Sequence, residues 1–202
     1  MAYRSTHQAR RTLADIAAGQ GGYFTAKQAA DAGYGRRHIV YHVKAGNFER
    51  VERGLFRLPT VALSAHDDLI RLSLWSRGRD DQPQAVVSHE TALGVHEMGD
   101  LLPEWIHLTV PRSFRKRPPR VCRLHRANLL AHEVEQREGF RLTTPLRTVL
   151  DVAEGDAVTQ DQLEVIVRQA RAAGLLRASQ IKAVVSGLPA DSRLARVFGK
   201  GE

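Results

Sequence analysis

The sequence predicts a two-domain protein of the α+β or α/β class, with one domain over residues 1–62 and a second over residues 63–202. Three observations lead to this prediction. The 202 residues are enough for two small hydrophobic cores. Hydrophobic residues make up 43% and charged residues 26%, as in an ordinary folded chain. Helical periodicity dominates the first 45 residues, whereas short strand-like segments alternate with helical ones afterwards.

The apolar runs and the cysteine count of the sequence predict its compartment and exclude two kinds of covalent stabilisation. No apolar run approaches the roughly 20 residues needed to span a bilayer, and the first residues lack the apolar segment of a signal peptide. We therefore expect a cytoplasmic protein. The single cysteine, Cys122, allows neither an internal disulfide nor a thiolate cluster for zinc, so packing must supply the stability.

Cations are concentrated in two parts of the chain. Residues 1–60 contain ten Lys/Arg against four Asp/Glu, whereas the other 142 residues contain twenty against eighteen. A second concentration, the basic loop Arg112–Arg126, contains seven cations and no acidic residue. With a net charge of +8, this distribution points to nucleic acid or an acidic surface as a partner.

The first two helices can be placed from spacing and capping residues. Apolar residues at spacings of three and four over residues 9–17 predict a first helix, which the glycine-rich run 19–22 ends. Thr25 and Gln28 form a Thr-x-x-Gln capping box, and the short helix that it begins ends at Gly33.

A third helix is predicted over residues 36–45, with two contrasting faces. We expect Ile39, Val40 and Val43 to form its buried face. The opposite face is expected to carry Arg37, His38 and Tyr41.

Residues 48–59 predict two short strands that turn near Arg53 and Gly54, which is the hairpin called a wing. Two helices joined by a tight glycine turn, followed by a wing, are typical of a winged helix-turn-helix whose second helix enters the major groove. For the charges alone, a solvated basic face is the alternative interpretation. The residues predicted to contact DNA are Thr25, Lys27, Gln28, Arg36, Arg37, His38, Tyr41, His42, Lys44, Arg50, Arg53 and Arg57.

The run GYFTAKQA at 22–29 and the wing element RGLFRLP at 53–59 resemble the N-terminal domain of the AbiEi-type antitoxins of type IV toxin-antitoxin systems. SHETAL at 88–93, IHLTVP at 106–111 and TPLRTVLD at 144–151 are similar, in order, to later segments of that family. The resemblance implies that the front domain represses its own operon by binding inverted repeats. It also implies that the remainder counteracts a neighbouring nucleotidyltransferase toxin, a system connected with phage defence.

The second domain is predicted to be a small mixed α/β domain with a helical C-terminal tail. Short strands and helices alternate through it. The expected elements are a helix at 65–77, a strand at 85–87, a helix capped by Ser88 and ending near 97, strands at 106–110, 121–125 and 140–142, a helix at 145–153, and another opened by the capping box Thr159–Gln162. We expect the strands at 106–110 and 121–125 to share a sheet.

Catalytic and metal sites are not expected. His89 and His96 are two helical turns apart, and no third ligand falls beside them at metal-binding spacing. Cys122 lies in an alternating strand without a motif that would activate a thiolate. A nuclease-like second domain is a further alternative, but the carboxylates between Asp151 and Glu164 fall at helix ends and no Glu-x-Lys element follows them. We expect a binding protein that needs no cofactor.

The basic loop has three possible roles at this point: a solvated loop, a second DNA contact, or a surface that supports antitoxicity. Prolines stiffen it and so lower the entropic cost of presenting its cations. The cations expected to act are Arg112, Arg115, Lys116, Arg117, Arg120 and Arg123. For the whole protein, a plain transcription regulator with a ligand-sensing or dimerising second domain is the alternative to an antitoxin.

Overall fold

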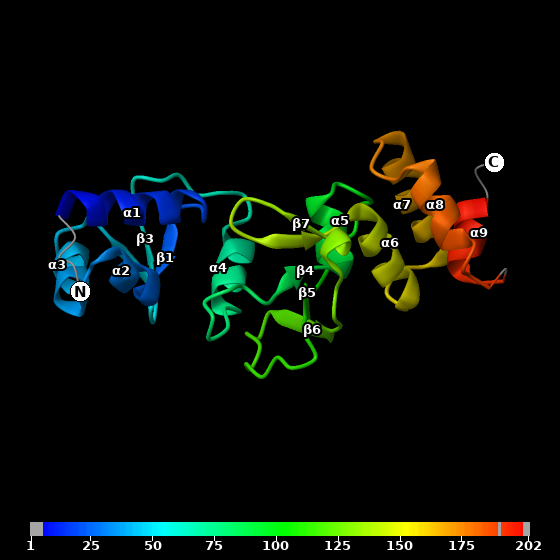
Figure 1. Ribbon diagram of the computed structural model, residues 1–202. Coiled ribbons are helices and arrows are strands. Elements are labelled where there is room, and N and C mark those ends of the chain that lie inside the picture. The colour runs from blue at the N-terminus through cyan, green and yellow to red at the C-terminus, as the bar shows by residue number, and fades with distance from the viewer. Residues whose placement is uncertain (1–5, 190, 200–202) are drawn as a thin grey trace. The chain divides into compact units, whose positions relative to one another are not determined.

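The computed structural model describes residues 6–189 and 191–199, which form two compact units (Figure 1). The first unit comprises the described residues up to Pro83 together with Gln136–Phe140, and the second comprises Gln84–Glu135 together with the described residues from Arg141 onwards. None of the described helices is long and apolar enough to cross a membrane.

Three helices and a small sheet form most of the first unit (blue to cyan in Figure 1). Its elements are α1 (Thr6–Ala18), β1 (Tyr23–Thr25), α2 (Ala26–Ala32), α3 (Arg36–Lys44), β2 (Glu49–Glu52), β3 (Leu55–Arg57) and α4 (Asp67–Trp75). The capping box is present, because the Thr25 hydroxyl accepts from the Gln28 amide and the Gln28 side chain accepts from the Thr25 amide. Gly33, at φ 112°, ends α2 in the left-handed conformation that glycine tolerates.

The wing is confirmed and forms part of a three-stranded antiparallel sheet. The strand order is β1-β3-β2, so the strand β1, which the sequence did not predict, pairs with the central strand β3. Gly54, at φ 80°, makes the turn between β2 and β3. Phe24 is fully buried, and its ring centroid lies 4.9 Å from that of Phe48 and 5.8 Å from that of Phe56. The three rings belong to one core cluster with buried residues of α1, α2 and α3, and this core joins the sheet to the helices.

The first compact unit extends beyond residue 62, where the sequence suggested a boundary. In α4, Asp67 Oδ2 accepts a hydrogen bond of 3.1 Å from the Tyr23 hydroxyl. Ile70 is fully buried against two glycines: a Cβ added at Gly21 would lie 2.7 Å from its side chain, and one added at Gly139 would lie 3.0 Å from it. Because these contacts fix α4 to β1 and to the glycine-rich run 19–22, the unit ends at Pro83. That residues 1–62 alone form the DNA-binding domain stays a prediction.

A five-stranded mixed sheet with helices forms the second unit. Its first elements are β4 (Val86–Val87), α5 (His89–Val95), β5 (Ile106–Val110), β6 (Cys122–Arg126), the 3₁₀ helix η1 (Ala131–Glu133), β7 (Val134–Gln136) and β8 (Arg141–Thr143). In the order β6-β5-β4-β8-β7, β5 pairs parallel to β6 and antiparallel to β4, and β4 pairs parallel to β8. The expected shared sheet is present, and β7 is the strand that sequence reasoning missed.

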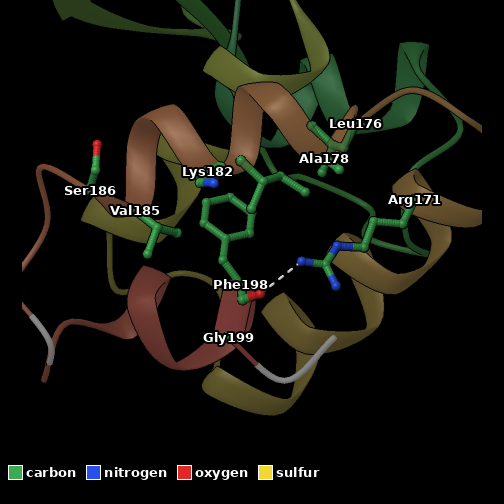
Figure 2. A pocket seen from close by; sticks show the side chains of 9 residues that line it. Arg171, Leu176, Ala178, Lys182, Val185, Ser186, Phe198 and Gly199 are labelled. Carbon is green, nitrogen blue, oxygen red and sulfur yellow. Dashed lines mark hydrogen bonds between the residues drawn. The ribbon is translucent and has the colours of Figure 1, made fainter. Parts of the chain in front are cut away.

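The helical tail consists of α6 (Pro145–Glu154), α7 (Gln160–Ala172), α8 (Ala178–Val185) and α9 (Arg193–Gly199). Leu163 and Ile166 of α7 are at most 1% exposed and pack with α5, α6 and α9 in one core. Figure 2 shows how α9 closes this region: Phe198 points towards α8, and Arg171 Nη2 donates to the Phe198 carbonyl at 2.8 Å. The fold class that the sequence predicted is therefore confirmed.

Candidate nucleic-acid interface

The helix pair α2–α3 has the compact turn that a helix-turn-helix needs. Tyr34 is buried in the turn, and its amide donates to the Ala29 carbonyl at 2.8 Å. Gly35 then precedes α3 as its N-cap residue. Because Ile39 is the buried residue of α3, the opposite side of this helix is presented to solvent.

Eight of the twelve predicted DNA-contacting residues are exposed. They come from the start of α2, from α3 and from the wing, and seven of them carry a cationic or imidazole side chain. They are Lys27, Arg36, Arg37, His38, Tyr41, Lys44, Arg50 and Arg53. Tyr41 is 66% exposed, so its ring is available to a partner. The structure thus collects most of the predicted side chains on one basic helix and its neighbouring hairpin.

Gln28 and Thr25 serve the fold instead of presenting polar groups to a phosphate. Gln28 is 8% exposed, and its amide nitrogen donates to Gln20 Oε1 at 2.9 Å. Its side-chain oxygen accepts from the Thr25 amide at 2.8 Å. The same capping box that made these two residues conspicuous in the sequence therefore uses up their hydrogen-bonding groups. The predicted DNA contact of Gln28 therefore stays a prediction, since in this conformation its side chain is buried and hydrogen-bonded within the unit.

Arg57, which the sequence predicted to contact DNA, is buried in this structure. It lies on the central strand β3, whose residues are all buried, and is itself 9% exposed. Its guanidinium contacts Glu49 Oε2 at 3.2 Å and donates to the Val61 carbonyl. Because β1 covers the other edge of β3, an arginine here is enclosed, whereas a simple two-stranded wing would have left it free.

The buried face of α3 differs from the expected one by an exchange of His42 and Val40. His42 is half-buried, with its ring centroid 4.8 Å from that of Phe48 and 5.3 Å from that of Tyr34. Burial, with a smaller contribution from the charge of His38, lowers the pKa of His42 below its usual value. Val40, which we expected to be buried, is 49% exposed. Because the His42 ring packs against Tyr34 and Phe48, position 42 faces the core and position 40 faces solvent.

A groove of about 590 Å³ lies between α2, α3 and the wing, and we call it the α3 groove. Apolar and small side chains form part of its lining, and four cations accompany them. The lining residues are Ala26, Ala30, Tyr34, Arg36, Ile39, Val40, Val43, Lys44, Arg50, Arg53, Gly54 and Phe56. No acidic residue is among them, so the groove suits an anionic partner that also offers apolar groups.

The basic loop of the second unit is structured and exposed. Phe114, 3% exposed, anchors it, and the carbonyl of Phe114 accepts from Arg126 Nη1 at 2.7 Å and from Arg115 Nη1 at 3.2 Å. The six cations that the sequence singled out are all exposed: Arg112, Arg115, Lys116, Arg117, Arg120 and Arg123. A loop held by a buried aromatic residue presents its charges from a defined position.

The second unit also contains a polar cluster that the sequence did not predict, the histidine cluster. Its members come from α5, β5, β6 and α6, and they are His89, Glu90, His107, His125, Arg147 and Asp151. The rings of His89 and His125 stack with centroids 3.5 Å apart and planes at 15°. His107 Nδ1 lies 2.6 Å from Glu90 Oε2 and 3.2 Å from His125 Nε2. The only sequence signal was the presence of one histidine on each of three neighbouring segments.

Burial perturbs the titration of this cluster strongly. Burial, and then the charge of His125, lowers the pKa of His89 to about 3, and burial with the charge of His107 lowers that of His125 to about 4. Burial raises the pKa of Asp151 to about 6, against the opposing hydrogen bond from Arg147. Burial alone would raise the pKa of Glu90, but the hydrogen bond with His107 and other favourable contacts outweigh burial and lower this pKa to about 2. The two stacked histidines are therefore neutral at pH 7.

The geometry of the cluster differs from that of a metal centre. Within residues 6–189 and 191–199, no group of three or more His, Cys, Asp or Glu side chains is arranged to hold a metal ion. His89 Nδ1 lies 3.0 Å from the Ser88 hydroxyl and 3.9 Å from Asp151 Oδ2, and the His89 ring stacks on the face of His125. The cluster is thus a buried polar network of the second unit.

Comparison with known proteins agrees with this architecture. The crystal structure of the RV2827C protein from Mycobacterium tuberculosis is similar over 99% of this chain and 79% of its own, with a TM-score of 0.54 and 16% sequence identity. At that identity the likeness is one of fold. No curated protein matched the chain. Residues 11–59, which contain α2, α3 and the wing, match the family described as "Transcriptional regulator, AbiEi antitoxin", and this confirms for the N-terminal segment of the chain the family that the sequence resembles.

Proposed function

We propose that this protein is a DNA-binding antitoxin that represses its own operon and counteracts a nucleotidyltransferase toxin. In this proposal it acts in the cytoplasm as a binding protein and not as an enzyme. The observation that carries the DNA-binding part is the exposed basic side of α3 with the wing beside it, in the segment that matches the regulator family. The antitoxin part is supported by the family description alone.

The exposed side chains divide into two groups by position. Arg37 and Tyr41 are one turn apart on the outer side of α3, where a recognition helix meets base edges. Arg50 and Arg53 lie on the wing, where a cation reaches the phosphate backbone. Base contacts give sequence preference, whereas phosphate contacts give affinity that depends on salt.

Replacing Arg37 by alanine should relax base preference, and replacing Arg53 should not. Loss of a bidentate contact to a base weakens the binding free energy by about 1–3 kcal/mol, mainly for duplexes that carry the preferred sequence. Loss of a phosphate contact weakens binding to all sequences alike and makes the affinity less sensitive to salt. The measurement is a binding titration with the full chain, on duplexes selected from a random-sequence pool and on unselected duplexes, over a salt series.

Arg168→Ala is the matched control, because Arg168 is an exposed arginine on α7. It should change neither affinity nor preference. If Arg53→Ala alters preference while Arg37→Ala leaves both quantities unchanged, the assignment of the two groups is reversed. If the chain retards no duplex at low salt, the proposed function itself is wrong.

The basic loop supports a second contact, either with DNA or with the toxin and its substrate. Reversing Arg115, Lys116 and Arg117 to glutamate should therefore impair one of two measurable activities. Reduced duplex affinity assigns the loop to DNA. Normal affinity with loss of growth rescue, when the variant is co-expressed with a nucleotidyltransferase encoded beside it, assigns the loop to antitoxicity. A folded variant that matches the wild type in both assays shows that the loop is only solvated.

A further inference from the structure

Val40 is an apolar side chain displayed on the basic surface of α3. Val40 is 49% exposed. It lies one helical turn from each of two charged residues, Arg36 and Lys44, which are on the same side of the helix. A β-branched residue adds nothing to the intrinsic stability of a helix surface, since its side chain loses rotational freedom there. The buried side of α3 is completed without it, by Ile39, His42 and Val43. Its position therefore suits contact with something outside the unit.

The surroundings of Val40 restrict the chemistry of that partner. Val40 lines the α3 groove together with the cations Arg36, Lys44, Arg50 and Arg53, and no carboxylate is among the lining residues. The occupant must therefore carry negative charge and present an apolar group within reach of the helix. A DNA strand does both, because its phosphates are anionic and the major-groove edge of thymine carries a 5-methyl group.

We infer that Val40 is a specificity-determining residue that contacts the 5-methyl group of a thymine in the bound DNA. The inference rests on the proposed DNA-binding function and adds to it an apolar contact beside the polar ones of Arg37 and Tyr41. A valine has no hydrogen-bonding group, so it distinguishes bases only by burying an apolar surface. Among the four bases, thymine alone offers a methyl group in the major groove.

The test replaces thymine by uracil, which removes the methyl group and keeps every hydrogen-bonding group. The full chain is titrated against a duplex selected from a random-sequence pool, and against a series in which each thymine of that duplex is replaced in turn by deoxyuridine. At one position or more the wild type should bind the uracil duplex about fourfold more weakly, which is the effect of one buried methyl group. Val40→Ala should bind the thymine duplex more weakly and should show no difference between the two duplexes at that position.

Leu130→Ala is the control, because Leu130 is another exposed aliphatic residue, 59% accessible, which lies in the second unit and outside the basic loop. It should keep the fourfold ratio. Thermal melting of Val40→Ala should match that of the wild type, since the side chain is half in solvent. The inference is overturned if no thymine position matters to the wild type, or if the ratio persists in Val40→Ala. If sedimentation shows that the wild type is dimeric and Val40→Ala is monomeric while the ratio persists, the groove holds a second copy of the chain and the inference is overturned. Absence of any duplex binding by the wild type overturns the inference and the proposed function together.

Discussion

Arg147→Ala should destabilise the second unit by about 3–5 kcal/mol, because it leaves a buried carboxylate without its partner. Asp151 has a side chain that is 3% exposed, and Arg147 Nε donates to it at 2.8 Å and Nη2 at 2.7 Å. Nη1 of the same arginine donates to Glu133 Oε1 at 2.9 Å, so one guanidinium joins α6 to η1. Urea denaturation followed by the fluorescence of Trp105, in a Trp75→Phe background, measures the free energy of unfolding of this unit, since the chain has two tryptophans, one in each unit.

Two further variants identify the cause of that loss. Adding Asp151→Asn to Arg147→Ala should recover part of the stability, because the neutral amide carries no buried charge. Arg168→Ala, at an exposed site on α7, should change the unfolding free energy by no more than about 0.5 kcal/mol. If the double variant is as unstable as Arg147→Ala alone, the unpaired carboxylate is not what destabilises the protein.

Lowering the pH from 6 to 4 should destabilise the second unit by about 3 kcal/mol. His89 and His125 have folded pKa values of about 3 and about 4, so they are largely neutral in the folded state and take up protons on unfolding between about pH 6.5 and these values. Each therefore removes about 1.4 kcal/mol per pH unit as the pH falls. Asp151 acts in the opposite direction, since its raised pKa of about 6 makes the folded state take up a proton first. Its gain offsets one histidine between pH 6 and 4, and the loss from the other remains. Glu90 adds a smaller loss near pH 4, because its lowered pKa of about 2 makes the unfolded state take up a proton first.

His125→Phe separates the histidines from other acid effects. Phenylalanine keeps a flat ring beside His89 and cannot be protonated. The stability of this variant, measured by Trp105 fluorescence as above, should fall by only about 1 kcal/mol between pH 6 and 4, since His89 and Asp151 then largely cancel and the loss from Glu90 remains. An acid sensitivity equal to that of the wild type would mean that His125 is not a source of the loss.

Features that depend on neighbours along the chain could be predicted from the sequence. The capping box at Thr25 and the wing turn at Gly54 are local, and both were placed correctly because hydrogen bonds and φ preferences act over a few residues. The exposed cations of α3 followed from helical spacing. These predictions succeed because the interactions that decide them join residues only a few positions apart in the sequence.

The errors arise where a distant residue decides the environment. Arg57 is enclosed because β1, more than thirty residues earlier, pairs with β3, and His42 is drawn inwards by Phe48 and Tyr34. The histidine cluster was invisible for the same reason. His125 meets His107 because β6 pairs parallel to β5 in one particular register, and no local pattern specifies that register.

Because Gln136–Phe140 belong to the first unit, this unit cannot complete its packing during protein synthesis until much of the second unit has been made. Gly139 lies against Ile70, and Phe140 contacts His66 with ring centroids 5.7 Å apart. After Pro83, the ribosome must add residues 84–140 before these contacts can form, which takes about 3–11 s at ordinary elongation rates. The nascent helix-turn-helix therefore spends that time with Ile70 incompletely covered. A stop codon or frameshift between these positions would leave a fragment that carries α3 and the wing but lacks part of the packing of its own unit.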